Sequence, residues 1–146
     1  WMNTIVYPMP SMLQYKFCAE ITWEDVMDKL NQELQTGSAK CMRHTYYLGN
    51  DYRPNTIQKA FDEVVGNCPL KLGDNEMHLF ISFTPNAQVF GKHRDNDDVF
   101  LVQAIGKMIY ELDREYVLSP GDSLFVPEGT YHTPKVIEPR VTLSFA

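Results

Sequence analysis

The most specific pattern in the chain is GDSLFVPEGTYH, which runs from Gly121 to His132 and has the spacing G-x5-P-x-G-x2-H. A shorter motif, His93-Arg94-Asp95, lies upstream of it. Side chains at positions i and i+2 of a strand point to the same face of a sheet, so an imidazole and a carboxylate spaced in this way can both reach one ion. The two motifs together supply two histidines and one carboxylate as candidate ligands of a metal ion.

This ligand set indicates a particular chemistry. Two histidines and one carboxylate form the facial triad of non-haem Fe(II) oxygenases, in which three protein ligands leave three coordination positions open. On this interpretation His93, Asp95 and His132 are the metal ligands and the catalytic residues. The structural alternative is that Asp95 caps a turn beside a surface histidine, an arrangement that often arises by chance.

Short strand-like runs surround both motifs. They are separated by turn residues such as Ser119-Pro120-Gly121-Asp122, and their close spacing is typical of a β-sandwich or barrel of jelly-roll type. The predicted strands cover Met77 to Thr84, Val99 to Ile105, Lys107 to Leu112, Tyr116 to Leu118, Ser123 to Val126, Pro134 to Ile137 and Arg140 to Phe145.

The first half of the chain begins with a predicted helix. Thr22 is a suitable N-cap, acidic residues follow it in the first turn, and Gly37 is a suitable end. Between them, apolar residues recur at helical spacing, which predicts the face that covers the sheet. These residues are Trp23, Met27, Leu30 and Leu34.

A second helix is predicted from Asn55 or Thr56 onward. Its apolar residues are expected to share one face, and Gly66 is expected to end it as the C′ glycine. The segment between the helices, Met42 to Leu48, is rich in tyrosine and threonine and predicts a strand.

The length and composition of the chain indicate how many domains to expect. The 146 residues are 44% apolar and 22% charged, which is typical of one compact globular domain. We expect a single domain over residues 1–146, with residues 1–75 as helical and strand support and residues 76–146 as the catalytic jelly-roll core. A chain of this length buries a core without metal or disulfide staples, so a bound metal is expected to be functional.

The net charge and the number of cysteines indicate which binding partners and which cellular compartment to expect. The chain has 13 Lys and Arg against 19 Asp and Glu, a net charge of −6, so duplex nucleic acid is not expected as a partner. Three widely spaced cysteines predict free thiols in a reducing compartment. Neither a signal segment nor an 18-residue apolar run is visible, so we expect a soluble cytoplasmic protein without membrane contact.

The motif that ends at His132 resembles the second motif of the cupin superfamily. The first cupin motif carries an H-x-H or H-x-D and ends in a glycine, which here is Gly106. Val136 stands where a trailing asparagine is expected.

The stretch from Phe80 to Leu112 resembles, more narrowly, the core of JmjC-type and ribosomal-oxygenase-type 2-oxoglutarate oxygenases. It shares their Pro-Asn-x-Gln segment, here with Asn86 and Gln88, and their strand with Gln103 ahead of the glycine. The resemblance covers about the last 70 residues. It implies an α+β, mainly β fold, a double-stranded β-helix with N-terminal helices packed on the barrel.

The same resemblance implies an activity. It is that of a 2-oxoglutarate-dependent dioxygenase, a hydroxylase, with Fe(II), 2-oxoglutarate and O2 as cofactor and co-substrates. His93, Asp95 and His132 would be the Fe(II) ligands. The JmjC-like pattern points by analogy to a protein side chain as substrate, although a small molecule fits the acidic chain equally.

At the position that binds the distal carboxylate of 2-oxoglutarate, this chain differs from the relatives that it resembles. Relatives carry a cation two residues beyond the glycine, where Met108 stands here. Other branches use Arg-x-Ser after the second histidine, and Arg140-Val141-Thr142 follows His132 by eight residues. A guanidinium binds a carboxylate bidentately and a hydroxyl adds a donor, so Arg140 and Thr142 are the expected anchor.

Two alternatives to this anchor stay open. Arg140 can instead form an ordinary ion pair with Glu138 or Glu128. Lys107 is the second candidate anchor, but alternation places it opposite Met108, which favours a solvated lysine.

The roles of other polar and aromatic residues are open. Asp97 and Asp98 could orient a ligand histidine or belong to a charged loop. His44 and His78 have no motif context. Three tyrosines could line a substrate cleft or pack in the core: Tyr46, Tyr47 and Tyr52.

Two further functions compete with the oxygenase. The first is a non-catalytic cupin that binds a metal or a small ligand, which the missing cation at Met108 favours. The second is a cupin enzyme independent of 2-oxoglutarate, which usually needs an additional histidine or glutamate ligand. The sequence leaves the substrate and the oligomeric state open.

Overall fold

The computed structural model describes residues 16–68, 76–87 and 91–146. Helix α2 (Trp23–Thr36) begins and ends as predicted, since the Thr22 hydroxyl accepts from the backbone N–H of Asp25 and Gly37 adopts a left-handed φ of 76°. Neither described helix is long and apolar enough to cross a membrane.

Helix α3 (Asn55–Asn67) is capped from outside its own sequence. Its N-cap, Pro54, makes no side-chain cap bond. The Asp25 carboxylate accepts from the Thr56 backbone N–H at 2.8 Å instead, so α2 caps the start of α3. The prediction that Gly66 ends the helix is wrong, because α3 continues through it to Asn67.

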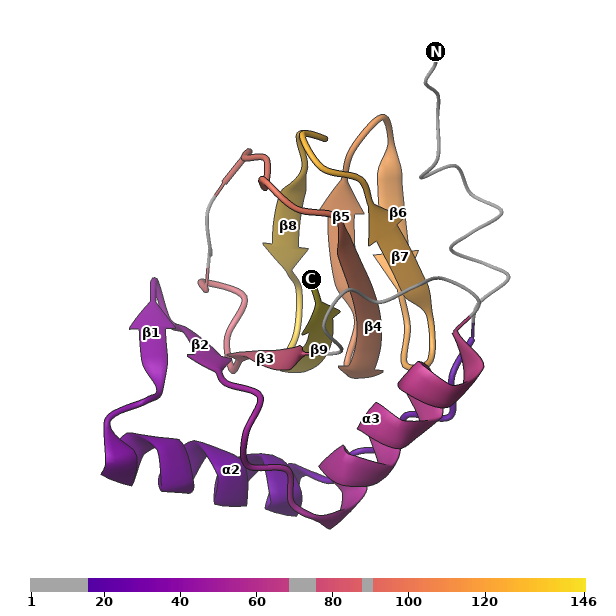
Figure 1. Ribbon diagram of the computed structural model, residues 1–146. Coiled ribbons are helices and arrows are strands. Elements are labelled where there is room, and N and C mark those ends of the chain that lie inside the picture. The colour runs from indigo at the N-terminus through magenta and orange to yellow at the C-terminus, as the bar shows by residue number, and fades with distance from the viewer. Residues whose placement is uncertain (1–15, 69–75, 88–90) are drawn as a thin grey trace.

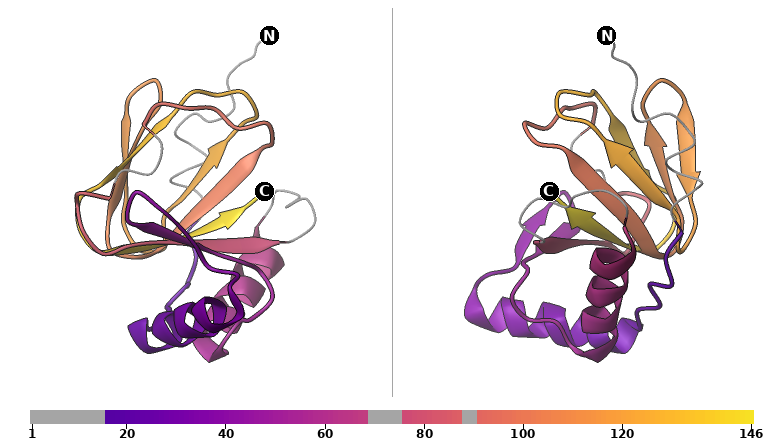
Figure 2. Two further views of the ribbon diagram at one scale, coloured as in Figure 1. Left: turned by 90° about the vertical axis from the view of Figure 1, so that its left-hand side faces the viewer. Right: turned by 45° about the vertical axis from the view of Figure 1, so that its right-hand side comes forward.

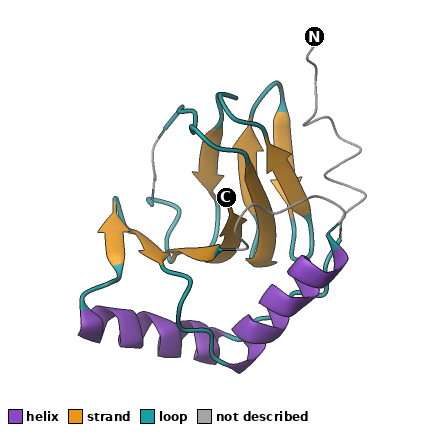
Figure 3. Ribbon diagram, viewed as in Figure 1, coloured by secondary structure: helices purple, strands orange, loops and turns teal. Residues whose placement is uncertain are grey.

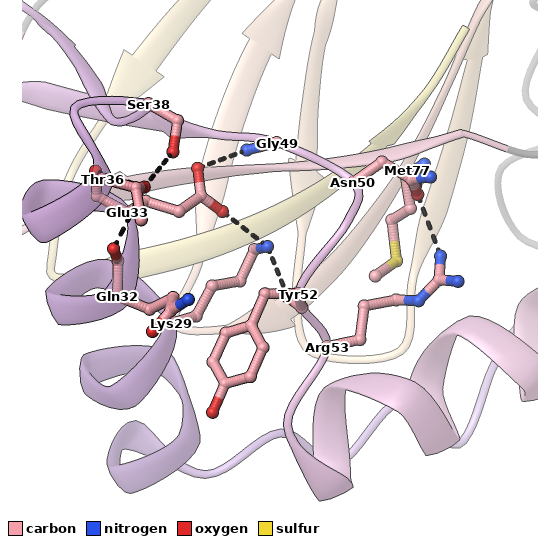
Figure 4. Close-up of polar contacts among 10 residues, drawn as sticks. All are labelled: Lys29, Gln32, Glu33, Thr36, Ser38, Gly49, Asn50, Tyr52, Arg53 and Met77. Carbon is pink, nitrogen blue, oxygen red and sulfur yellow. Dashed lines mark hydrogen bonds and ion pairs between the residues drawn. The ribbon is translucent and has the colours of Figure 1, made fainter.

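The buried face of α2 differs from the prediction. Met27 and Leu34 are exposed, whereas Lys29 and Glu33 are buried. The Lys29 ammonium lies 2.7 Å from the Glu33 carboxylate and also donates to the Tyr52 carbonyl (Figure 4). The other Glu33 oxygen accepts from the Gly49 N–H at 2.8 Å. Paired charges thus join α2 to the chain segment that leads to α3.

Two antiparallel sheets hold the described strands. The larger has the order β1 (Lys40–Met42), β2 (Thr45–Leu48), β3 (Met77–Ser82), β9 (Arg140–Phe145), β4 (Val99–Ile105) and β7 (Ser123–Val126). The smaller has the order β6 (Glu115–Leu118), β5 (Met108–Glu111) and β8 (Thr133–Val136). The strand predicted over Met42 to Leu48 is wrong in one respect: it is a hairpin, which turns at Arg43 and His44 with positive φ.

The larger sheet has two chemically different faces. Its outer face is apolar and packs against the helices, which lie on the side away from the smaller sheet (Figures 1 and 3). Its inner face carries polar side chains such as Ser82, Arg140 and Thr142. One cross-strand row of the outer face consists of Leu48, Leu79, Leu143 and Val102.

The smaller sheet faces this inner surface across a second apolar cluster, to which Met108, Tyr110 and Leu118 contribute from one sheet and Leu101 and Leu124 from the other. The two facing antiparallel sheets form a jelly roll, the double-stranded β-helix, with helices packed outside it (Figure 2). The predicted fold class is confirmed.

Candidate active site

A two-residue antiparallel bridge brings the two predicted motifs together. The backbone N–H of His93 donates to the His132 carbonyl at 3.0 Å, and the N–H of His132 donates to the His93 carbonyl at 2.8 Å. The backbone N–H of Gly129 donates to the Asp95 carbonyl at 2.9 Å. Asp98 accepts from the Glu128 N–H, so its carboxylate holds the two loops together.

The three candidate ligands converge. One ligand atom each from His93, Asp95 and His132 lies within 4.8 Å of the others. The Nε2 atom of His132 is 3.4 Å from one carboxylate oxygen of Asp95, and that of His93 is 3.8 Å from the other. Three ligand atoms grouped in this way can share one ion.

The hydrogen bonds of the two imidazoles indicate which atoms would bind it. Nδ1 of His93 lies 3.0 Å from the Gly91 carbonyl, and Nδ1 of His132 lies 2.9 Å from the Thr130 carbonyl. Assigned from these contacts, Nδ1 carries the hydrogen and the Nε2 lone pair faces Asp95. Burial lowers the pKa of His132, which favours its neutral form. A divalent cation fits between the two Nε2 atoms and the carboxylate, and the donor set matches the facial triad.

A cavity of about 350 Å³ opens beside the triad, between the two sheets. Its lining combines apolar strand residues with polar residues of the inner face of the larger sheet. The lining includes the three residues of the triad and, from the strands, Tyr47, His78, Phe80, Tyr110, Arg140 and Ser144.

Arg140 lies in this cavity with its side chain almost fully buried, 1% exposed. Its Nε donates to the Ser82 hydroxyl at 3.0 Å and its Nη1 to the Thr142 hydroxyl at 2.8 Å. Within residues 16–68, 76–87 and 91–146, no Asp or Glu lies within ion-pair distance of it, so the ion pair with Glu138 or Glu128 is absent. Burial lowers the pKa of Arg140 and nearby Tyr110 opposes that shift.

Thr142 was predicted to anchor the co-substrate together with Arg140, but its position differs from that prediction. It is not among the residues that line the cavity. Its hydroxyl accepts from Arg140 and donates to Gln103 Oε1 at 2.8 Å, and the Gln103 amide donates in turn to the carbonyl of Gly106. Thr142 therefore holds the guanidinium in place and does not itself face the cavity.

Lys107 is not brought to the site. It is exposed, its backbone N–H donates to Glu138, and its side chain is not part of the cavity lining. Met108, by contrast, is fully buried in the cluster between the sheets. The structure thus offers Arg140 and not Lys107 as the cation of this cavity.

The other residues near the motifs differ in whether they line the cavity. Gln88 lies outside the described residues. Asn86 belongs to a turn, where its N–H donates to Thr84, and it does not line the cavity. Arg94 points toward the ring of Tyr131, at 5.5 Å, and Asp97 lies on the cavity wall.

Three aromatic residues also line the cavity: Tyr47, for which a cleft or a core position was open, and His78 and Phe80, for which no role was predicted. Tyr47 stacks on His78 with ring centroids 4.9 Å apart and planes at 11°, and it lies 4.9 Å from Phe80. The period-two alternation of β3 places His78 and Phe80 on one face. That alternation is visible in the sequence and predicts that the two side chains share a face. It does not predict that this face borders a cavity.

Comparison with known proteins adds evidence on the fold. No known protein family and no curated protein matches the sequence. The ribosomal oxygenase YcfD of Escherichia coli is similar in structure, with a TM-score of 0.55, 20% identity and 69% of this chain covered. Its complexes with cobalt and 2-oxoglutarate and with cobalt and succinic acid give the same values. The chain spans 30% of the length of these structures. At this identity the likeness establishes a shared fold, the double-stranded β-helix.

Proposed function

We propose that the protein is an Fe(II)- and 2-oxoglutarate-dependent oxygenase that hydroxylates a protein side chain or a small molecule. One observation carries the proposal: the cavity that holds the His93, Asp95 and His132 triad also holds a buried arginine with no acidic partner in the described part of the chain. A buried cation without a counter-ion is unfavourable, so the cavity suits an anion.

Each residue would have a defined task. The Nε2 atoms of His93 and His132 and the Asp95 carboxylate would hold the metal on one side and leave its other positions open. Arg140, oriented by Ser82 and Thr142, would bind the distal carboxylate of 2-oxoglutarate. When bound, iron and the keto acid supply O2 activation, with oxidative decarboxylation to succinate and CO2 and one oxygen atom transferred to the substrate.

Two further points support this reading. A carboxylate at Asp95 occupies the position that halogenases of this superfamily leave open for halide, which favours hydroxylation. YcfD, a ribosomal oxygenase with the same fold, binds cobalt and 2-oxoglutarate in one of its structures.

The test is binding and turnover of 2-oxoglutarate after anaerobic reconstitution with Fe(II). We expect saturable binding by calorimetry and succinate release, slow without the substrate. Arg140→Ala should weaken 2-oxoglutarate binding by about a hundredfold or more while Co(II) affinity stays within about threefold, since a charge-assisted pair is lost. Arg140→Lys retains the charge, so its 2-oxoglutarate affinity should lie between those of the wild type and Arg140→Ala.

Three results would contradict the proposal or one part of it. Metal-loaded protein that neither binds 2-oxoglutarate nor releases succinate contradicts it. Metal binding with 2-oxoglutarate binding but no consumption, even with candidate substrates, supports the non-catalytic cupin. Unchanged 2-oxoglutarate affinity in Arg140→Ala removes Arg140 as the anchor.

A further inference from the structure

The cavity extends beyond the reach of a co-substrate anchored at Arg140. Arg140 and Ser144 both line the cavity and lie four residues apart on β9, which corresponds to about 13 Å along a strand. The four C–C bonds of 2-oxoglutarate, each about 1.5 Å, span roughly 5 Å between the carboxylate carbons. A molecule held at Arg140 therefore leaves the Ser144 end unfilled.

Three strands build this second end. Ser144 lies directly opposite His78 in the register of β9 and β3. Tyr47, from β2, stacks on the His78 ring with the planes at 11°, and Phe80 lies beside Tyr47. All four side chains line the cavity, so they present a wall of aromatic rings next to one hydroxyl.

This wall carries no formal charge. Burial lowers the pKa of His78, which outweighs the nearby carboxylate of Glu76, and burial raises the pKa of Tyr47. Both rings are thus neutral near pH 7. Of the charged lining residues, Asp95 and Asp97 belong to the triad and its loop, and Arg140 lies at the co-substrate end of the cavity. A charged ligand group would lose its hydration here without gaining a counter-charge, whereas the aromatic rings can stack on a flat uncharged group.

We propose that Tyr47, His78 and Ser144 form the substrate subsite, and that it takes a planar, uncharged group such as an amide or an aromatic ring. The rings of Tyr47, His78 and Phe80 would contact the faces or edges of that group. The His78 ring nitrogen and the Ser144 hydroxyl would bond to its polar atoms. This inference rests on the proposed function, because it assigns the end of the same cavity that the co-substrate leaves open.

The experiment uses metal-free protein, so that it does not depend on oxygenase activity. Benzamide and cyclohexanecarboxamide carry the same amide on a planar and a non-planar ring, and their binding is followed by two-dimensional NMR. We expect benzamide to bind about fivefold or more tightly than the non-planar probe, with shifts at Tyr47, His78 and Ser144. His78→Leu and Tyr47→Leu should each weaken benzamide binding by about fivefold or more.

The matched control is Tyr46→Leu, which alters the neighbouring tyrosine of β2 whose ring packs with the helix-side core. It should bind benzamide as the wild type does. His78→Phe, which keeps an aromatic ring, covers the case in which a leucine variant fails to fold, and it should retain the preference for the planar probe. Equal affinity for both probes, shifts confined to other residues, or wild-type binding by folded His78→Leu overturns the subsite. Because the readout needs neither metal nor 2-oxoglutarate, a failed subsite and a failed oxygenase assignment give different results.

Discussion

The Nε2 atom of His132 lies 3.4 Å from a carboxylate oxygen of Asp95, while Nδ1 of the same ring faces the Thr130 carbonyl. With the hydrogen on Nδ1, a lone pair and an anion face each other. Such an arrangement is stabilised by a cation between them. The backbone bridge between His93 and His132 holds this geometry in place from both sides.

Loss of a ligand should therefore abolish metal binding without unfolding the protein. We expect His132→Ala and Asp95→Asn each to weaken Co(II) binding by more than about a hundredfold, since even changes around ligands cost 10–100-fold. The measurement is the Co(II) absorption spectrum during titration. His44→Asn is the control, because His44 lies at an exposed hairpin turn with positive φ that asparagine tolerates. Wild-type Co(II) affinity in both ligand variants would refute the triad.

Removal of the Thr142 hydroxyl should destabilise the protein and loosen Arg140. Thr142→Val has nearly the same shape, but it leaves the Arg140 donor and the Gln103 acceptor without their shared partner. We expect a loss of about 1–3 kcal/mol in the free energy of unfolding, measured in urea, and weaker 2-oxoglutarate binding.

Thr142→Ser tests whether the hydroxyl is responsible. It retains the hydroxyl and should recover most of the stability and the affinity. If valine and serine variants are equally stable, the hydroxyl does not hold this network.

The Lys29 and Glu33 pair should behave as a coupled unit. Lys29→Met leaves a buried carboxylate without its cation, and we expect a loss of about 3 kcal/mol or more in urea unfolding. Adding Glu33→Gln removes the charge but keeps an acceptor for the Gly49 N–H, so the double variant should recover more than half of that loss. Lys40→Met, at an exposed strand position, should change stability by less than about 0.5 kcal/mol. Additive effects of the two changes would contradict the coupling.

Gly106 should not tolerate a side chain. It has a φ of 70°, and a Cβ built there would overlap the carbonyl oxygen of Pro139. Gly37, with a φ of 76° at the end of α2, has open space around its Cβ position. We expect Gly37→Ala to lose about 1 kcal/mol in thermal unfolding, from the backbone strain alone. Gly106→Ala should lose several times that, from strain and overlap together, and equal losses would show that the overlap is relieved by small shifts.

Local patterns predicted most of the fold. Strands β4, β7 and β9 have the predicted bounds, because alternating or apolar runs between turn residues leave few other places for a strand to begin or end. The caps of α2 were predicted for the same reason, since a threonine and a glycine satisfy the ends of a helix through nearby backbone groups.

Predictions failed where a residue's environment comes from distant parts of the chain. The predicted apolar face of α2 included Met27 and Leu34, which are exposed, whereas Lys29 and Glu33 are buried. Contacts with Tyr52 and Gly49 make their burial favourable. Likewise, Asp25 of α2 caps the start of α3, and the sequence around α3 does not predict this contact.

The motif pattern, with the resemblance that it carries, predicted candidate residues for a metal and a co-substrate, because the chemistry of histidine, carboxylate and guanidinium groups belongs to each residue itself. It nominated His93, Asp95, His132 and Arg140. The packing of the strands places Thr142 against Arg140, leaves Lys107 outside the cavity and brings Tyr47 and His78 to its wall. These positions follow from strand order, because β2, β3, β9 and β4 are neighbours in the sheet although they are far apart in the chain. The pairing of the strands sets which side chains share a face.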